Sequence, residues 1–128
     1  MTSCMAYDTV SRTWRVLPPL VRARDACVAE YVDGRVWAIG GVGVDTIESI
    51  AAAGEDRWTE EVRLQLPAGW DCYNVGCVLD GKIYLFGNQG LLSFTPATRQ
   101  WDASLPTPPV SSSTHSRCLL SSSLWWFK

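Results

Sequence analysis

This 128-residue chain has residues of the types that catalyse reactions or bind metals, but their spacing does not match a known catalytic or metal-binding motif. His115 is the only histidine, and Cys72 and Cys77 lack the second close pair that a zinc site usually has. Glu60 and Glu61 are adjacent, so in a strand they point to opposite faces rather than acting together as a carboxylate pair. We therefore expect no catalytic residue, no metal and no cofactor in this chain.

Two further features have a structural interpretation. The run Gly40-Gly41-Val42-Gly43 is rich in glycine, but a dinucleotide-binding loop needs Gly-x-Gly-x-x-Gly at the start of a helix, and no helix is predicted here. We expect these glycines to allow a tight bend and close packing instead. Cys77 and Cys118 each lie four residues before a hairpin turn position, which favours a small buried side chain.

A repeat positions all of these residues. Trp14, Trp58 and Trp101 follow one another at intervals of 44 and 43 residues, and a Leu-Pro pair follows each of them. A second aromatic residue follows each tryptophan after 23 to 26 residues, within a short apolar run. These second aromatic residues are Trp37, Tyr84 and Trp125. A fixed period of about 40–50 residues indicates a blade or solenoid repeat.

Within each repeat the residue pattern predicts strands. Asp33-Gly34 and Asp80-Gly81 separate pairs of apolar runs, and Asp-Gly tolerates the positive φ angles of a two-residue hairpin turn. The flanking strands are expected at 27–32 and 35–39, and at 76–79 and 82–86. The alanine-rich segment Ile47–Ala53 occupies a strand position of the repeat, so we predict a strand there too. The unit is therefore a four-stranded antiparallel sheet.

Composition restricts the class of partner and the cell compartment. Hydrophobic residues make up 47% of the chain, charged residues 19%, and the net charge is −2, so neither a nucleic acid nor an anionic membrane is indicated as a partner. There is no apolar run long enough for a transmembrane segment, and the N-terminus does not look like a signal peptide. Five cysteines without a secretory signal are typical of reduced thiols, so we expect a cytoplasmic or nuclear protein.

The repeat resembles that of kelch-repeat proteins, in which a pair of glycines ends an aromatic strand and a Tyr and a Trp follow. The matching residues are Gly40-Gly41 with Trp58, Tyr7 with Trp14, and Phe94 with Trp101. The second copy departs from the pattern with Gly87-Asn88, and the last copy has Ser122 where glycine is expected. The resemblance implies an all-β fold, a kelch-type β-propeller built from four-stranded antiparallel blades.

Aligned on this pattern, the chain divides into four segments. Residues 1–24 would hold the outer two strands of a partial blade plus the loop that enters the next blade. Residues 25–69 and 70–110 would each form a full blade, and 111–128 the first two strands of a truncated blade. These amount to about three blades, whereas a closed propeller typically has four to eight, so we expect an incomplete ring. Its open edges would allow self-association, and two chains together would have enough blades to close one ring.

The repeated residues are expected to be structural. Large aromatic rings would pack between neighbouring blades and bury much apolar area, and the glycines would serve the turns and bends. The structural set comprises Trp14, Gly34, Trp37, Gly40, Gly41, Trp58, Gly81, Tyr84, Gly87, Trp101 and Trp125.

The resemblance implies a protein-binding platform, and many family members are substrate receptors joined to BTB or F-box modules of ubiquitin ligases. Loops that enter the first strand or leave the second would carry the binding residues, because loops often carry function and Arg, Tyr and Trp are common in interface hot spots. The candidates are Arg22, Arg24, Asp25, Asp45, Trp70, Asp71, Tyr73, Asn74, Asn88 and His115. Arg24 has a second interpretation, as a tie between adjacent blades.

Two other interpretations remain open. The chain could be part of a kelch-like enzyme, such as a copper-radical oxidase or a sialic acid epimerase, with its catalytic groups outside these residues. It could also be a non-functional truncated product. The preferred hypothesis is a non-enzymatic protein–protein interaction module whose partner is another protein.

Overall fold

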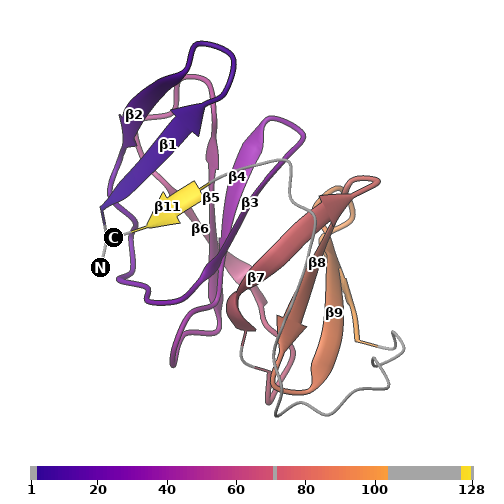
Figure 1. The fold of residues 1–128 in the computed structure, drawn as a ribbon. Helices are drawn as coiled ribbons and strands as arrows, with labels where there is room; N and C mark the ends of the chain where they lie inside the picture. Colours follow the sequence, from indigo (N-terminus) through magenta and orange to yellow (C-terminus); the bar gives the residue numbers. More distant parts are fainter. Residues whose placement is uncertain (1–2, 71, 104–124, 128) are drawn as a thin grey trace.

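The computed structural model describes residues 3–70, 72–103 and 125–127, which form eleven β-strands (Figure 1). Their bounds are β1 Cys4–Asp8, β2 Thr13–Leu17, β3 Val28–Val32, β4 Arg35–Ile39, β5 Thr46–Ala51, β6 Thr59–Gln65, β7 Cys72–Leu79, β8 Lys82–Gly87, β9 Gly90–Thr95, β10 Gln100–Asp102 and β11 Trp125–Phe127. Strand β5 confirms the strand predicted over the alanine-rich segment. The described residues include no helix with the length and apolar character needed to span a membrane.

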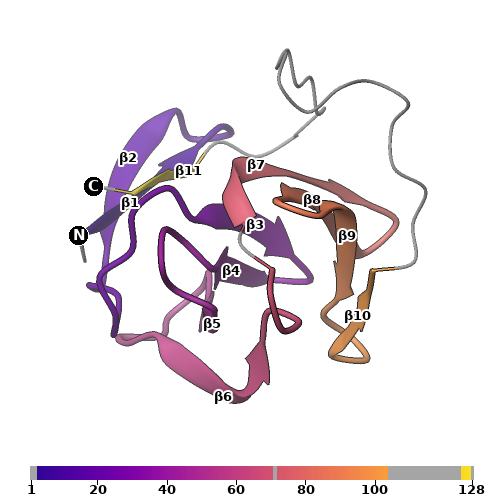
Figure 2. The ribbon, with the colours of Figure 1, turned by 90° about the horizontal axis from the view of Figure 1, so that it is seen from below.

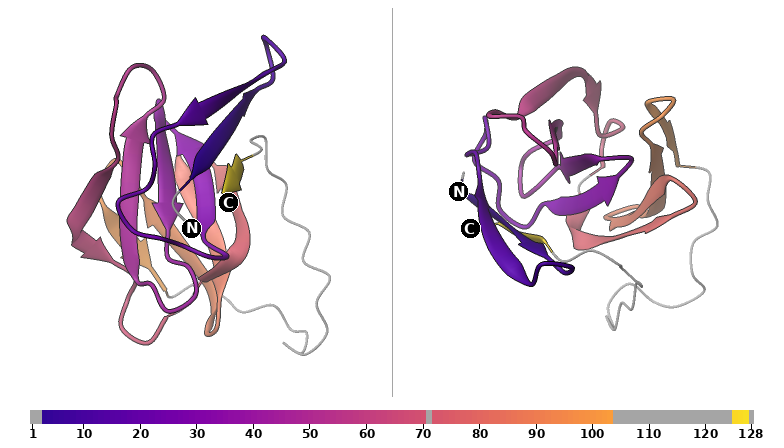
Figure 3. Two further views of the ribbon diagram at one scale, coloured as in Figure 1. Left: turned by 90° about the vertical axis from the view of Figure 1, so that its left-hand side faces the viewer. Right: turned by 90° about the horizontal axis from the view of Figure 1, so that it is seen from above.

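The strands form three antiparallel sheets. The first sheet has the order β11-β1-β2, the middle sheet β3-β4-β5-β6, and the third sheet β10-β9-β8-β7. The middle sheet lies between the other two (Figure 2), and the same order is visible from the side and from above in Figure 3. The prediction of an all-β chain with four-stranded antiparallel blades is confirmed, and the arrangement is that of a partial kelch-type propeller.

The two ends of the chain share the first sheet. Strand β11 pairs with β1, with Trp126 opposite Met5, and β1 pairs in turn with β2. The sequence assigned these strands to half blades at opposite ends of the chain, and the structure joins them. The turn position of the last copy, where Ser122 stands in place of the expected glycine, lies outside the described residues.

Both predicted Asp-Gly turns are present. Asp33 and Gly34 have φ angles of 51° and 78°, and Asp80 and Gly81 have φ angles of 50° and 73°. Two consecutive positive φ angles match the right-handed twist of the flanking strands, which is why this dipeptide joins them so tightly. The turn chemistry therefore sets the register of β3 with β4 and of β7 with β8.

The larger core lies between the middle and third sheets. Trp37 of β4 meets Phe94 of β9 edge to face, with ring centroids 5.4 Å apart, and Phe94 also packs on Trp101 at 4.8 Å. Gly76 allows β7 to approach β3, because a Cβ atom there would lie 2.6 Å from Cγ1 of Val28. The structural roles predicted for Trp37 and Trp101 agree with this packing.

A second core joins the first and middle sheets. Its residues are Cys4, Ala6, Leu17 and Leu20 on one side and Val36, Ala38, Ile50 and Trp58 on the other. Trp58 also donates a hydrogen bond from Nε1 to the carbonyl oxygen of Pro18, at 2.8 Å. Burial raises the pKa of the Cys4 thiol to about 12 and that of Cys27 to about 11, so both thiols are protonated at neutral pH.

The prediction that every repeated aromatic side chain packs between blades is wrong for Trp14. Trp14 is 51% exposed and its ring contacts that of Tyr7 at a tilt, with centroids 5.1 Å apart, on the face of β1 and β2 that points away from the middle sheet. Tyr84 is also only half-buried, because it too points away from the middle sheet. It alternates with Ile83 and Leu85, which face the middle sheet, so it points the other way.

Candidate functional site

Four connections gather at the lower end of the sheets in Figure 1. They are residues 18–27 between β2 and β3, 40–45 between β4 and β5, 66–70 between β6 and β7, and 88–89 between β8 and β9. Consecutive antiparallel strands reverse direction, so every second connection returns to the same end. The lower loops, as we call these segments, include most of the residues that the sequence proposed for binding.

Arg24 is a buried tie in these loops rather than a contact for a partner. Its side chain is fully buried and forms an ion pair with Glu48 at 2.9 Å. Its guanidinium also donates hydrogen bonds to the carbonyl oxygens of Gly40, at 2.9 Å, and Thr46, at 2.6 Å. The prediction that Arg24 contacts a partner is therefore wrong in this conformation. The alternative interpretation, a structural tie, agrees better with these contacts. The sequence suggested a tie between adjacent blades, whereas Arg24 ties loop 18–27 to the middle sheet.

Glu48 completes the tie and was not singled out from the sequence. Its carboxylate accepts hydrogen bonds from the backbone amides of Val21, at 2.6 Å, and Arg22, at 3.1 Å, as well as from Arg24. The sequence did contain a signal for this role. Glu48 stands between Ile47 and Ile50 in a buried strand, and a buried charge needs a partner. Glu48 thus fixes the path of loop 18–27.

Backbone and amide hydrogen bonds hold the other lower loops to one another. The amide of Val42 donates to the carbonyl oxygen of Asp25, and the amide of Leu66 donates to that of Asp45, each at 2.8 Å. The side-chain amides of Asn88 and Gln89 both donate to the carbonyl oxygen of Gly69. These bonds connect four of the predicted binding segments, those of Asp25, Asp45, Trp70 and Asn88.

Gly41 is needed where loops 18–27 and 40–45 meet. It has a φ of +126°, and a Cβ atom at this position would lie 3.0 Å from the carbonyl oxygen of Asp25. Both the backbone conformation and the close approach exclude a larger residue. The glycine pair of the repeat therefore allows the two loops to come into contact. The sequence predicted that these glycines would allow a tight bend and close packing.

The exposed residues of the lower loops form a mixed surface. Arg22 forms an ion pair with Glu60 at 2.6 Å, and Asp25, Asp45 and Asn88 are exposed. Val21 and Val42 are also exposed there, and neither was among the predicted candidates because an isolated valine carries no signal in a sequence. We define the lower surface as Val21, Arg22, Asp25, Val42, Asp45 and Asn88.

The remaining candidates lie elsewhere or outside the described residues. Trp70 is half-buried and packs against the larger core, so only part of its side chain is available. Tyr73 and Asn74 were predicted in a loop, but they lie within β7, which begins at Cys72 and has an irregular register with β8 before Gly76. Asp71 and His115 lie outside the described residues.

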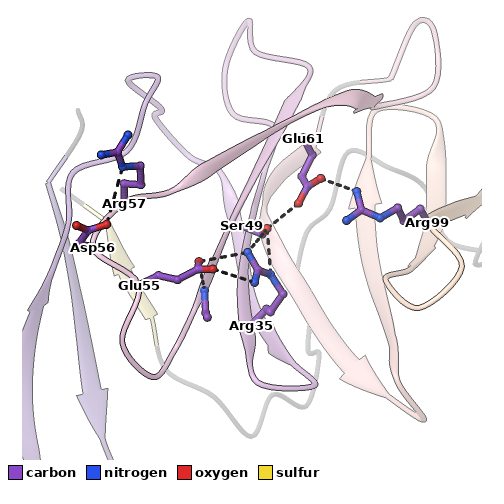
Figure 4. A network of polar contacts seen from close by, with 8 residues as sticks. Arg35, Ser49, Glu55, Asp56, Arg57, Glu61 and Arg99 are labelled. Carbon is purple, nitrogen blue, oxygen red and sulfur yellow. Dashed lines mark hydrogen bonds and ion pairs between the residues drawn. The ribbon is translucent and has the colours of Figure 1, made fainter.

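A second polar cluster lies at the opposite end of the sheets (Figure 4). Arg99, in the turn before β10, pairs with Glu61 of β6, and Glu61 accepts a hydrogen bond from the hydroxyl of Ser49 at 2.8 Å. Arg35 donates to Ser49 and pairs with Glu55 at 3.4 Å. This network ties the third sheet to the middle sheet, and each charge in it has a partner, which indicates a structural role. Within residues 3–70, 72–103 and 125–127, no three His, Cys, Asp or Glu side chains gather as metal ligands would.

Comparison with known proteins points to one group. The chain is 30% identical to the F-box/kelch-repeat protein At1g26930 of Arabidopsis thaliana over 69 residues, which are 48% of this chain and 16% of the relative. It is 24% identical to the F-box/kelch-repeat protein At4g39580 of the same plant over 140 residues, covering 98% of this chain and 34% of the relative. The chain resembles kelch-repeat proteins. A third F-box/kelch-repeat protein of the plant, At1g67480, is 32% identical over 87 residues, 65% of this chain and 22% of the relative.

The similarity covers only part of each relative. No protein-family model matches the chain, and the chain spans 16% to 34% of the length of these three relatives. The relatives and the fold agree with the kelch resemblance carried by the glycine pair and the Tyr and Trp residues of the repeat. Such relatives suggest a module for protein interaction.

Proposed function

We propose that this chain binds a protein partner through the lower surface. The observation that carries the proposal is the combination of exposed side chains with a buried support. Val21 and Arg22 protrude from a loop whose two backbone amides are held by the carboxylate of Glu48, which is itself paired with buried Arg24. A surface fixed in this way loses little conformational entropy on binding, which favours affinity.

The chemistry of the lower surface suits a protein better than a small molecule. The exposed apolar residues Val21 and Val42 stand beside Arg22, Asp25 and Asp45, which carry both signs of charge. Apolar contacts surrounded by polar groups are typical of transient protein interfaces. The partner is therefore expected to present an apolar centre with charges of both signs around it.

The experiment is affinity capture with matched surface variants. The whole chain is immobilised, and bound proteins are quantified by mass spectrometry for the wild type, Val42→Lys, Asp45→Arg and the control Val62→Lys. Val62 is 78% exposed on β6 and lies outside the lower loops. One protein should bind the wild type and the control equally and bind each lower-surface variant at least about tenfold less, as for hot-spot residues. Equal loss in the control, or no loss in either variant, would contradict the proposal.

We further propose that the partner is a substrate of a ubiquitin ligase. The names of the relatives combine an F-box with kelch repeats, and the resemblance stated above joins such platforms to ligases. Excess free chain in cells should then compete for the partner and lengthen its half-life. An unchanged half-life despite measured binding would overturn the ligase role and leave the binding proposal standing.

A further inference from the structure

The charges of the lower surface are not balanced. The lower loops contain two arginines, and each of them already has an acidic partner from the middle sheet. Buried Arg24 pairs with Glu48 of β5 at 2.9 Å. Arg22 pairs with Glu60 of β6 at 2.6 Å. Both positive charges of the lower loops are therefore compensated within the chain.

Two aspartates of the lower loops have no such compensation. Asp25 and Asp45 are both exposed. Neither carboxylate takes part in the ion pairs that the structure shows within residues 3–70, 72–103 and 125–127. The uncompensated charge of the lower surface is thus negative.

The two aspartates lie beside the exposed valine of loop 40–45. Val42 is in a tight turn, in which the amide of Val44 donates to the carbonyl oxygen of Gly41 at 3.1 Å. The amide of Val42 itself donates to the carbonyl oxygen of Asp25 at 2.8 Å, and Asp45 directly follows the turn. Val42 is 60% exposed. An exposed apolar side chain thus has an aspartate beside it in each of two loops that contact each other.

The opposite end of the sheets has a different charge distribution. Its exposed residues include the cations Arg12, Arg57 and Lys82 as well as the turn aspartates Asp33 and Asp80. A basic partner would meet repulsion as well as attraction there, whereas at the lower surface it meets uncompensated negative charge. Charge complementarity therefore favours the lower end for a basic partner.

We propose that the partner docks on the lower surface through a segment in which lysine or arginine residues flank an apolar side chain. The apolar side chain contacts Val42, and the flanking cations face Asp25 and Asp45. Complementary charges around an apolar centre speed association and disfavour wrong partners. This inference rests on the proposed function and specifies the partner's chemistry, because positive charges outnumber negative ones in the segment that meets these three residues.

The test measures binding of the whole chain to an array of synthetic peptides that share an apolar centre and differ in their flanking residues. Peptides flanked by lysine or arginine should bind, and matched peptides flanked by glutamate should not. Asp25→Asn and Asp45→Asn should each weaken binding about twofold to fivefold, as expected for exposed charge pairs, and added salt should weaken wild-type binding. The controls Asp33→Asn and Asp80→Asn remove the same charge from the opposite end and keep a favoured Asn-Gly turn, so they should bind like the wild type.

Three results would overturn the inference. They are binding that prefers glutamate flanks, absence of binding to peptides of either class, and an equal loss in the controls, which would indicate attraction to the net charge alone. Affinity capture with Val42→Lys separates this failure from that of the proposed function. If a captured protein depends on Val42 while the basic peptides do not bind, the docking surface stands and the basic segment is wrong.

Discussion

Replacing Arg24 by methionine should destabilise the whole chain rather than merely weaken binding. The substitution keeps an unbranched side chain but removes the guanidinium from Glu48 and from the carbonyl oxygens of Gly40 and Thr46. The carboxylate of Glu48 would remain buried, with the backbone amides of Val21 and Arg22 as donors. Breaking a buried ion pair from one side costs about 3–5 kcal/mol, a large part of the roughly 5–15 kcal/mol that stabilises a typical domain.

Urea unfolding followed by circular dichroism measures this loss. The double variant Arg24→Met/Glu48→Leu removes both charges, so its loss of unfolding free energy should be at least about 2 kcal/mol smaller than the sum of the two single losses. Arg57→Met is the matched control, because the pair of Arg57 with Asp56 is exposed on both sides. It should leave the unfolding midpoint unchanged.

Two results would refute the reasoning. A loss below about 1 kcal/mol for Arg24→Met would mean that the ion pair does not hold loop 18–27. Additive losses in the double variant would mean that Arg24 and Glu48 act separately. If Arg24→Met does not fold, Arg24→Lys provides the measurement, because it retains the charge and should show a smaller loss.

Three further predictions concern the cores. Gly76→Ala should lower the free energy of unfolding by about 1–3 kcal/mol, because it forces a methyl group against Val28. Val28→Ala should then cost less stability in the Gly76→Ala variant than in the wild type. Equal costs in both backgrounds would argue against the contact. Phe94→Ala should cost about 3–5 kcal/mol in urea unfolding, and a loss under about 1 kcal/mol would contradict its place in the core. Burial raises the pKa of Cys27 to about 11 and that of Cys4 to about 12 from an ordinary value of 9.0, so the stability that each thiol contributes is complete below pH 9 and is lost as pH rises toward 11. Unfolding free energy should fall there by about 1 kcal/mol per pH unit for each of the two thiols, and Cys27→Ala should remove its own share and so about halve their combined slope. An unchanged slope in Cys27→Ala would show that other groups cause the fall.

The parts of the fold that could be predicted depend on local chemistry. Asp33-Gly34 and Asp80-Gly81 each specify a two-residue turn through their own φ angles, so the hairpins follow from four residues. The tryptophan period then placed one sheet after another, and the segment at β5 was assigned correctly because the repeat outweighed its helix-forming alanines.

The errors arise where long-range contacts decide. Arg24 looks like an exposed loop cation in sequence, and its burial depends on Glu48, 24 positions later. The period marks Trp14 as equivalent to Trp58 but cannot say whether another sheet covers it. Tyr73 and Asn74 lie in a strand because Cys72 pairs with Gly87 beyond an irregular register, which no local pattern indicates.

The central claim is that the lower end of this kelch-like array binds protein. The most direct measurement is site-specific photo-crosslinking from single positions of the full chain, with the partner identified by mass spectrometry. Probes at Val42 and Asp45, in the lower loops, should crosslink to the same protein, whereas probes at Asp33 and Asp80, in the turns at the opposite end, should not. Crosslinks of equal yield from both ends, or only from Asp33 and Asp80, would contradict the account.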